Sequence, residues 1–419
     1  MIDKKTTACA NDYVIRVLDS PAEVDAHAWN ALLFSQPQAT PFMRHEYLNA
    51  LHASGCATSD TGWTPKFFLL ERQGVLLAAC VLYLKTHSHG EYVFDWAWAK
   101  AYAQHGLAYY PKALCAVPFT PVPGTRLLAR SQDDREQLAA ALLDFCQQQQ
   151  LSGLHSLFAS DDDLAAFEKS GLLLRHTVQF HWQNATPGYA GFDAFLAQLT
   201  AEKRKKIRQE RRKVADAGVS FRVSKGSQIS PADWEFFYQC YERTYLEHGN
   251  APYLNRDFFA RMASTMFEDW LLFVAERDGQ AIAASLIAIN TSCTGAQTGN
   301  AERVAYGRYW GALERVDCLH FEACYYQPLA WCIANGYQRF EGGAQGEHKL
   351  ARALLPVTTT SAHWLEQPQF LAAVDRYLSA ERAGIQSYVA DLHQHSPLKS
   401  ELRPAPCAAS EHPAPERPG

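Results

Sequence analysis

An internal repeat constrains the fold of this chain more than any other feature of its sequence. Residues 66–84, KFFLLERQGVLLAACVLYL, are followed much later by a similar stretch, LLFVAERDGQAIAASLIAI, at residues 271–289. The residues that match at an offset of 205 positions are Glu71, Arg72 and Gly74 with Glu276, Arg277 and Gly279. Two apolar runs on either side of Gln73-Gly74 are typical of a β-hairpin. The pattern therefore predicts two repeats of one structural unit.

The similarity extends to the flanking segments. Trp29 matches Trp234 at the same offset, and PFMRHEYLNAL from Pro41 parallels PYLNRDFFARM from Pro252. In each repeat a helix-like stretch then ends at a glycine and precedes a short strand. This order predicts an α/β fold with a mixed sheet, in two domains at residues 13–190 and 191–393. The Pro-rich tail, 394–419, is expected to be disordered.

Composition and charge exclude several classes of protein. The net charge of −5 gives no global attraction to nucleic acid. The lysines near the N-terminus are not followed by an apolar stretch, so we expect a cytoplasmic protein without a transmembrane segment. The eleven cysteines form no paired Cys-x-x-Cys motif. No metal is therefore expected, and the sequence leaves any cofactor unknown.

A strongly basic segment follows the predicted domain boundary. Residues 202–213 contain eight Lys or Arg and only two Glu, and they favour a helix over residues 200–217. Such a surface attracts phosphate groups of RNA, nucleotides or anionic lipids, although a merely solvated charged face is the alternative. The candidate anion- or RNA-binding residues are Lys203, Arg204, Lys205, Lys206 and Arg208.

A second candidate segment, residues 91–128, places Asp95, Lys112 and Arg126 among many aromatic residues. Buried charges need partners, so these side chains either pair with one another or contact a ligand. Aromatic walls with a few polar groups are typical of a small-molecule or peptide cleft. An ordinary core with a buried ion pair is the alternative.

The third candidate segment follows an expected strand and reads FEGGAQGEHKLAR at residues 340–352. Glycine-rich turns at strand ends let the backbone approach a substrate. Glu341 or Glu347 is suited to deprotonate an amine, and His348 to act as acid or base near neutral pH. Lys349 or Arg352 is suited to hold an anion. A loop whose charges pair with each other is the alternative.

These motifs resemble known families. The repeated unit looks like the GNAT acetyltransferase fold, and two units in tandem look like the Fem-type peptidoglycan aminoacyltransferases. Three sets of motifs are similar to a bacterial family of predicted N-acyltransferases, which is also described as peptidoglycan biosynthesis or recognition proteins. They are EGGAQGEHKL with TSAHW, FDWAWA with YYPK and PFTPVPGTRLL, and KRKKIRQERRKV. The site residues that this resemblance implies are Asp95, Trp96, Lys112, Arg126, Glu341, Gln345, Glu347, His348, Lys349 and Arg352.

Two departures accompany the resemblance. Where the family usually has Arg-Gly after the leucine, this chain reads Ala351-Arg352-Ala353-Leu354. In residues 304–336 the usual CoA-binding loop of acetyltransferases is missing, and Arg308, Trp310 and Gly311 give only an echo of it.

The resemblance implies an N-acyltransferase that transfers an acyl or aminoacyl group to an amine acceptor, small molecule or peptide, with a connection to the cell wall. Acyl-CoA is the expected donor, and aminoacyl-tRNA is the alternative that the basic helix favours. A non-catalytic recognition protein is the alternative from another class. Because the first repeat reads FASDDDLAAF where the second has its glycine-rich motif, the chemistry is expected in the second repeat.

Overall fold

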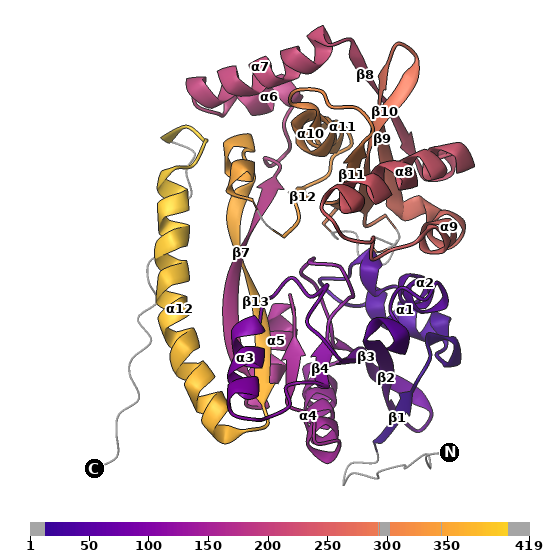
Figure 1. The fold of residues 1–419 in the computed structure, drawn as a ribbon, viewed down its shortest axis with the longest axis vertical. Helices are drawn as coiled ribbons and strands as arrows, with labels where there is room; N and C mark the ends of the chain where they lie inside the picture. Colours follow the sequence, from indigo (N-terminus) through magenta and orange to yellow (C-terminus); the bar gives the residue numbers. More distant parts are fainter. Residues whose placement is uncertain (1–12, 292, 294–301, 345, 401–419) are drawn as a thin grey trace.

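Thirteen strands of the described chain belong to one mixed sheet (Figure 1). The structure, a computed structural model, describes residues 13–291, 293, 302–344 and 346–400. The strands run in the order β1-β2-β3-β4-β6-β13-β7-β12-β11-β10-β9-β8, and β5 pairs with β3. The mixed α/β architecture expected from the sequence is therefore present.

Elements β1 to β7 form the first repeat and β8 to β13 the second. The strands of the first repeat are β1 (Val14–Leu18), β2 (Trp63–Arg72), β3 (Val75–Lys85), β4 (Lys112–Cys115), β5 (Leu128–Ala129), β6 (Gly153–Ser156) and β7 (Leu173–Gln183). Those of the second are β8 (Val219–Lys225), β9 (Trp270–Arg277), β10 (Gln280–Ile289), β11 (Val304–Ala312), β12 (Arg339–Glu341) and β13 (Leu355–Leu365).

The helices follow the same division. The first repeat has α1 (Ala26–Phe34), α2 (His45–Ala53), α3 (Trp96–Gln104), α4 (Gln132–Gln148) and α5 (Asp161–Lys169). Next come α6 (Phe192–Ala197), α7 (Ala201–Asp216), α8 (Pro231–Glu247), α9 (Arg256–Thr265), α10 (Leu319–Phe321), the π-helix η7 (Glu322–Tyr326), α11 (Gln327–Ala334), the 3-10 helix η8 (Glu347–Arg352) and α12 (Pro368–Gln394).

The structure contains both predicted hairpins, and a helix with a matched tryptophan precedes each of them. Both predicted hairpins form, as β2–β3 and β9–β10. Their turns place Gln73 and Gly74, and likewise Asp278 and Gly279, in the left-handed region of backbone conformation, which two-residue hairpin loops require. The matched Trp29 and Trp234 lie in α1 and α8, both within the hydrophobic core.

The two repeats exchange their last strands. β7 of the first repeat pairs with β12, whereas β13, from the end of the second repeat, pairs with β6 as well as with β7. Figure 1 shows β7 and β13 running side by side between the two repeats, with α12 along them. The proposed domain boundary after residue 190 falls beyond β7, but the sheet itself continues across both repeats.

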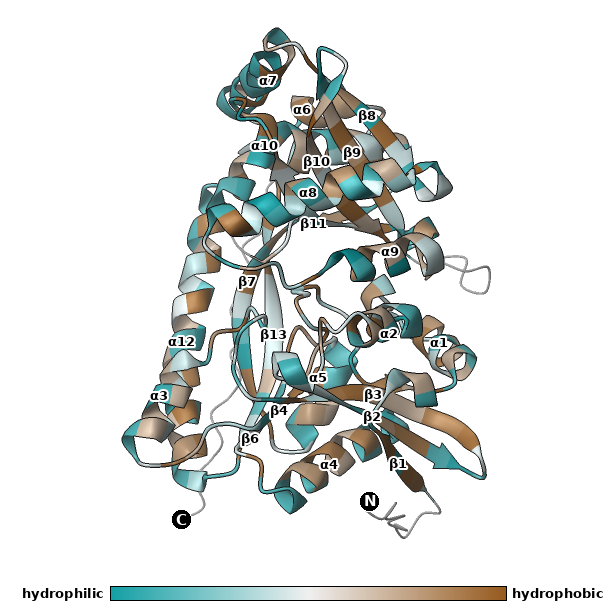
Figure 2. Cartoon of the chain, turned by 45° about the vertical axis from the view of Figure 1, so that its right-hand side comes forward, coloured by the Kyte–Doolittle hydropathy of each residue, from teal (hydrophilic) through white to brown (hydrophobic). Residues whose placement is uncertain are grey.

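One hydrophobic core is shared by both repeats. Helices α1 and α2 of the first repeat and α8 and α9 of the second contribute to it, and the rings of Tyr47 and Phe258 make an edge-to-face contact with centroids 5.4 Å apart. Figure 2 shows the apolar colour on strands such as β3 and β9, a paler β13, and the hydrophilic colour over much of α7. Aromatic contacts across the repeats stabilise their relative position.

The predicted disorder of the tail is wrong for its first residues. Residues 395–400 return to α6 and α7: Leu398 bridges Leu199, and the Thr200 N–H donates to the Pro397 carbonyl at 2.9 Å. Backbone hydrogen bonds and the buried Ser396 hold this segment in spite of its prolines. Residues 401–419 lie outside the described residues.

Candidate active site

The site is built where β11 and β12 diverge. These parallel strands pair only from Val304 with Arg339 to Tyr306 with Glu341. Just beyond, β11 bulges against β10, so that Arg308 is the extra residue between Gly307 and Tyr309. A side chain at Gly307 would approach the Phe340 ring to 3.0 Å, which explains the glycine. Bulges of this kind occur beside active sites because they redirect side chains.

Glu341 ends β12 and is 3% exposed. Arg339 donates its Nε–H to Glu341 Oε1 at 3.1 Å, while Oε2 is buried without a hydrogen-bond partner. Burial raises the pKa of Glu341 to about 7, although the charge of Arg339 opposes the rise. A carboxyl group with a pKa near neutrality and an unengaged oxygen is suited to general-base catalysis.

His181 approaches Glu341 from the neighbouring strand β7. Its Nε2 lies 4.0 Å from Glu341 Oε2 and 3.2 Å from Gln179 Oε1. Burial, helped by the charges of Arg339 and Lys349, lowers the pKa of His181 to about 3. The imidazole is therefore neutral at physiological pH and does not neutralise Glu341.

A cavity of about 720 Å³ contains Glu341 and His181. Both repeats line it: residues 34–40, from the last residue of α1 onward, form one side and residues 357–360 of β13 another. The charged side chains among its lining are Asp161, Glu302, Arg339 and Glu341. This volume lies within the range of pockets for drug-sized ligands, and the acidic excess favours a cationic ligand such as an amine.

The other described residues that were predicted in the 341–352 motif do not line this cavity. Glu347 is exposed and accepts a hydrogen bond from the Tyr388 hydroxyl at 2.6 Å. His348 is also exposed, and its Nε2 lies 3.1 Å from the Tyr325 hydroxyl. Their predicted catalytic roles stay predictions. Gln345 lies outside the described residues.

Lys349 and Arg352 are buried rather than presented to solvent. Lys349 donates to the Gly343 carbonyl at 3.1 Å, and burial lowers its pKa to about 8. Arg352 forms an ion pair with Glu210 of α7 at 3.0 Å and lies over the Phe321 ring. Lys349 thus holds the turn after Glu341, and Arg352 attaches α7 to η8. Contact of either with substrate stays a prediction.

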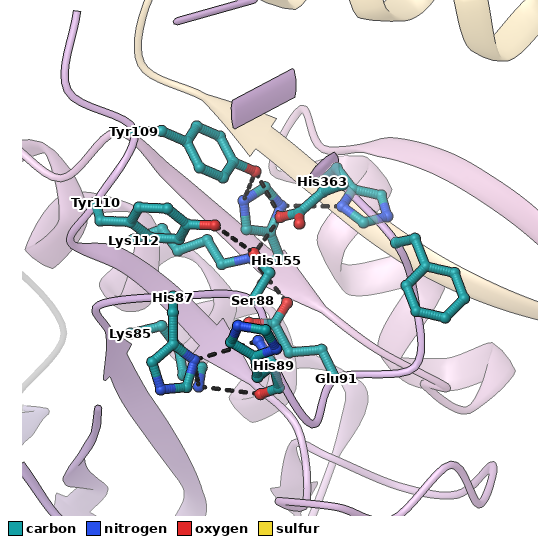
Figure 3. A network of polar contacts seen from close by, with 12 residues as sticks. Lys85, His87, Ser88, His89, Glu91, Tyr109, Tyr110, Lys112, His155 and His363 are labelled. Atoms are coloured by element: carbon teal, nitrogen blue, oxygen red, sulfur yellow. Dashed lines mark hydrogen bonds and ion pairs between the residues drawn. The ribbon is translucent and has the colours of Figure 1, made fainter. Parts of the chain in front are cut away.

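Glu91, Asp95 and Lys112 belong to a buried polar network in the first repeat (Figure 3). Lys112 donates to Ser88 at 2.9 Å, to Glu91 at 2.7 Å and to Asp95. Burial by itself raises the pKa of Asp95, but Lys112 outweighs it and the pKa falls below its usual value. The structure thus pairs Asp95 with Lys112, the arrangement expected for a buried ion pair, and substrate contact stays a prediction.

The network continues from the first repeat to β13. The Tyr109 hydroxyl donates to Asp95 at 2.7 Å and lies 3.3 Å from His155. His155 Nδ1 is in turn 2.9 Å from His363 Nδ1 on β13 (Figure 3). Polar contacts therefore accompany the strand exchange.

Trp96 and Arg126 have contrasting environments. Trp96 begins α3 and is 44% exposed, with its ring 5.2 Å from that of His89. Arg126 is 1% exposed and donates to the carbonyls of Leu157, Gly124 and Val122. Arg126 therefore holds its own loop, and neither residue lines the 720 Å³ cavity.

The predicted basic helix is confirmed as α7, which Thr200 precedes and Gly218 follows. Ile207, Glu210 and Val214 are its buried residues, and Lys205, Lys206 and Arg208 are exposed. Lys203 pairs with Glu202, and Arg204 donates to the Leu199 carbonyl. Figure 1 shows α7 at the edge of the second repeat, away from the first.

Sequence reasoning missed several residues of the site. Arg339 precedes Glu341 by two positions and so lies on the same face of β12, a spacing that already suggests the pair. His181 and residues 34–40 reach the site only through the strand exchange and the packing of the repeats. Arg308, Trp310 and Gly311, which were noted only as an echo of the missing CoA-binding loop, lie within strand β11.

No three His, Cys, Asp or Glu side chains among the described residues form a group suited to a metal ion. No described helix, α12 included, combines the length and the apolar character that a membrane crossing requires.

The comparisons with known proteins agree with this architecture. A FemAB-like family model, described as peptidoglycan biosynthesis/recognition, matches residues 20–400. The crystal structure of FemX is 11% identical and covers 86% of this chain and 100% of its own, with a TM-score of 0.50. No curated protein sequence matches the chain.

Another solved structure is the C-terminal domain assigned to a lysylphosphatidylglycerol synthetase from Agrobacterium fabrum. It is 12% identical and covers 86% of this chain and 97% of its own, with a TM-score of 0.51. A tandem GNAT protein from the clavulanic acid biosynthesis pathway is 14% identical. The match covers 85% of this chain and 99% of the GNAT protein, with a TM-score of 0.42. Structural likeness at such identities shows the fold alone, and the predicted fold class is confirmed.

Proposed function

Because the chain belongs to the FemAB-like family of peptidoglycan biosynthesis/recognition proteins, we propose that it acylates an amine with Glu341 as the general base. The family match agrees with the predicted class, a Fem-like acyl- or aminoacyltransferase connected with the cell wall. The observation that carries the role of Glu341 is its buried, unpartnered Oε2 on a carboxyl group whose pKa is about 7.

Acyl transfer to an amine needs a base because a protonated amine has no lone pair for attack. Glu341 accepts the proton, the amine nitrogen bonds to the acyl carbon, and the thiolate or alkoxide of the donor leaves. A base with a pKa near the working pH is most effective, and such bases contribute about 10²- to 10⁴-fold to the rate. Arg339 holds one oxygen of Glu341 and leaves the other for the amine.

The 720 Å³ cavity is the proposed acceptor site. Its carboxylates attract a cationic amine, and its walls from both repeats fix the orientation of the acceptor. Lys349 supports the site indirectly, since it holds the Gly343 carbonyl in the turn that follows Glu341.

Two donors remain in the proposal. Acyl-CoA is the first, on the resemblance to GNAT enzymes. Aminoacyl-tRNA is the second, and the exposed cations Lys205, Lys206 and Arg208 on α7 favour it because they attract phosphates. Both donors occur in the cytoplasm, where we place the protein.

A transfer assay tests the proposal. The protein is incubated with acetyl-CoA or aminoacyl-tRNA and with peptides that carry a free α- or ε-amine, and the products are identified by mass spectrometry. We expect the acceptor to gain the mass of the acyl group, and Glu341→Gln to lower the rate at least about 100-fold. Glu366→Gln, which alters an exposed residue after β13, is the matched control. Transfer by Glu341→Gln at the parental rate would contradict the role of Glu341.

A further inference from the structure

A second cavity of about 180 Å³ is lined in part by Gly342 and Gly343, which follow Glu341 in the chain. Its aromatic walls come from both repeats and consist of Tyr92, Phe119, Tyr241, Tyr245 and Tyr309. Its remaining wall contains Arg308 and the backbone of Gly342 and Gly343. Glu341 lines the larger cavity and Gly342 the smaller, so two consecutive residues at the end of β12 contribute to the two cavities.

Among the described residues that line this smaller cavity, Arg308 alone carries a positive charge. Its Nη2 donates to the Phe119 carbonyl at 2.8 Å and more weakly to the hydroxyls of Thr120 and Tyr309. Its Nε is buried and has no hydrogen-bond partner. The guanidinium stays protonated, and the rings of Phe42 and Tyr309, with centroids 5.2 and 5.0 Å from its carbon, offset only part of the cost of leaving its charge without a carboxylate.

Several other arginines in buried or partly buried positions of the described chain are compensated. Arg339 pairs with Glu341, Arg352 with Glu210 and Arg135 with Asp163. Arg126 has no carboxylate partner at that range, but backbone carbonyls accept from its Nε, Nη1 and Nη2. Arg308 has neither a carboxylate within ion-pair distance among the described residues nor a full set of acceptors.

The walls of this cavity also hold unusual backbone conformations. Tyr92 and Phe119 both have positive φ angles, 64° and 57°. Aromatic residues rarely adopt this region, and such strain persists where the surroundings enforce it, often at ligand sites. Phe119 stacks on Tyr253 with ring centroids 4.7 Å apart, and its carbonyl accepts from Arg308, so contacts to the second repeat hold it.

We propose that this cavity binds a carboxylate group, and that the acceptor is an amino acid-like molecule with an amine at one end and a carboxylate at the other. One guanidinium balances one carboxylate, whereas a phosphate carries more charge. The cavity is smaller than pockets for drug-sized ligands, and its aromatic walls suit a short carbon chain.

The two cavities have complementary charges for such a molecule. The amine lies in the cavity with Asp161, Glu302 and Glu341, and the carboxylate contacts Arg308. The proposal of a carboxylate subsite depends on Arg308 and not on the proposed function. The proposal that the bound molecule is the acceptor does rest on the proposed function.

Ligand binding tests the subsite without any catalytic readout. Butyrate and butyramide have the same shape and differ in charge, so their affinities are compared by saturation-transfer NMR titration. We expect butyrate to bind at least about tenfold more tightly than butyramide, and Arg308→Gln to abolish the difference. Arg315→Gln, at an exposed arginine after β11, is the control and should keep the difference.

Arg308→Lys keeps a positive charge and distinguishes loss of the subsite from loss of folding. It should retain a preference for butyrate while Arg308→Gln does not. Equal binding of butyrate and butyramide to the parent protein, or an unchanged preference in Arg308→Gln, would overturn the proposal. Inorganic phosphate that displaces butyrate with higher affinity would also overturn the assignment to carboxylates.

The acceptor assignment is tested separately with 4-aminobutyrate and 4-aminobutanamide. We expect the first to bind more tightly in an Arg308-dependent manner and Glu341→Gln to weaken both. Arg308-dependent binding of butyrate without any transfer activity would leave the subsite intact and reject the proposed function. Transfer activity without a preference for carboxylates would leave the proposed function intact and reject the carboxylate subsite.

Discussion

Arg339 donates its Nε–H to one carboxylate oxygen of Glu341 at 3.1 Å and leaves the other oxygen without a partner. The two residues are neighbours on one face of the short strand β12. This one-sided pairing fixes the carboxyl group while burial still raises its pKa to about 7. The combination gives Glu341 both a defined position and a basicity suited to neutral pH.

Folding stability should depend on pH through Glu341. Its pKa in the folded state, about 7, lies above its ordinary value of 4.5, so folding favours the protonated form. The contribution is therefore fully present below about pH 4.5 and is lost as the pH rises through 7. Relative to the parent protein, Glu341→Gln should gain up to about 3 kcal/mol of unfolding free energy between pH 5 and pH 8.

Urea unfolding of both proteins at the two pH values measures this gain. Glu366→Gln, at an exposed position, should show no such change. A difference between Glu341→Gln and the parent that stays constant with pH would show that the pKa of Glu341 is not raised.

The buried network around Lys112 should make a large contribution to stability. Lys112→Met leaves the carboxylates of Glu91 and Asp95 without their cation, and such unpaired buried charges cost about 3–5 kcal/mol. Lys100→Met, at an exposed position on α3, should change the unfolding free energy little. In a double-mutant cycle, adding Asp95→Asn to Lys112→Met should recover part of the lost unfolding free energy. If the two substitutions changed the unfolding free energy additively, the result would argue against the pairing.

Attachment of α7 should depend on the ion pair between Glu210 and Arg352. Glu210→Ala leaves Arg352 buried without its carboxylate and removes the acceptor of the Tyr326 hydroxyl. We expect faster amide hydrogen exchange in residues 201–216 than in the parent protein, with no such effect of Glu202→Ala on the exposed face. Unchanged exchange in Glu210→Ala would mean that apolar contacts alone hold the helix.

The exposed cations of α7 provide a test of the tRNA alternative. Replacement of Lys205, Lys206 and Arg208 by glutamine should weaken RNA binding and reduce the slope of log K against log salt by about 2, at ~0.7 per phosphate contact. Fluorescence titration at several salt concentrations measures the slope. Absence of RNA affinity in the parent protein would exclude this donor.

Local sequence signals predicted the repeated elements well. The hairpins and α7 follow from turn residues and helix-forming composition, which act over a few positions. The exchange of β7 and β13 was not predictable, because a repeated sequence does not say which copy of the last strand pairs with which sheet. Residues 395–400 are held by backbone hydrogen bonds to residues 198–200. Such contacts cannot be predicted from the amino-acid composition of the tail.

The same distinction applies to the site. Glu341 was predicted because its glycine-rich turn follows a strand. His181 reaches Glu341 only after the strand exchange, and Arg308 gains its significance from aromatic residues far away in sequence. The sequence indicated that Asp95 and Lys112 need partners, and the structure shows that the two side chains form an ion pair with each other.

The pH dependence of kcat/KM for acyl transfer tests the central role of Glu341 most directly. For the parent protein we predict a rate that rises with pH through a midpoint near 7, as Glu341 loses its proton, and a second rise where the acceptor amine itself ionises. Glu341→Gln should lack the first rise and be slower by at least about 100-fold. A midpoint near 7 that persists in Glu341→Gln would contradict the account, because another group would then be the base.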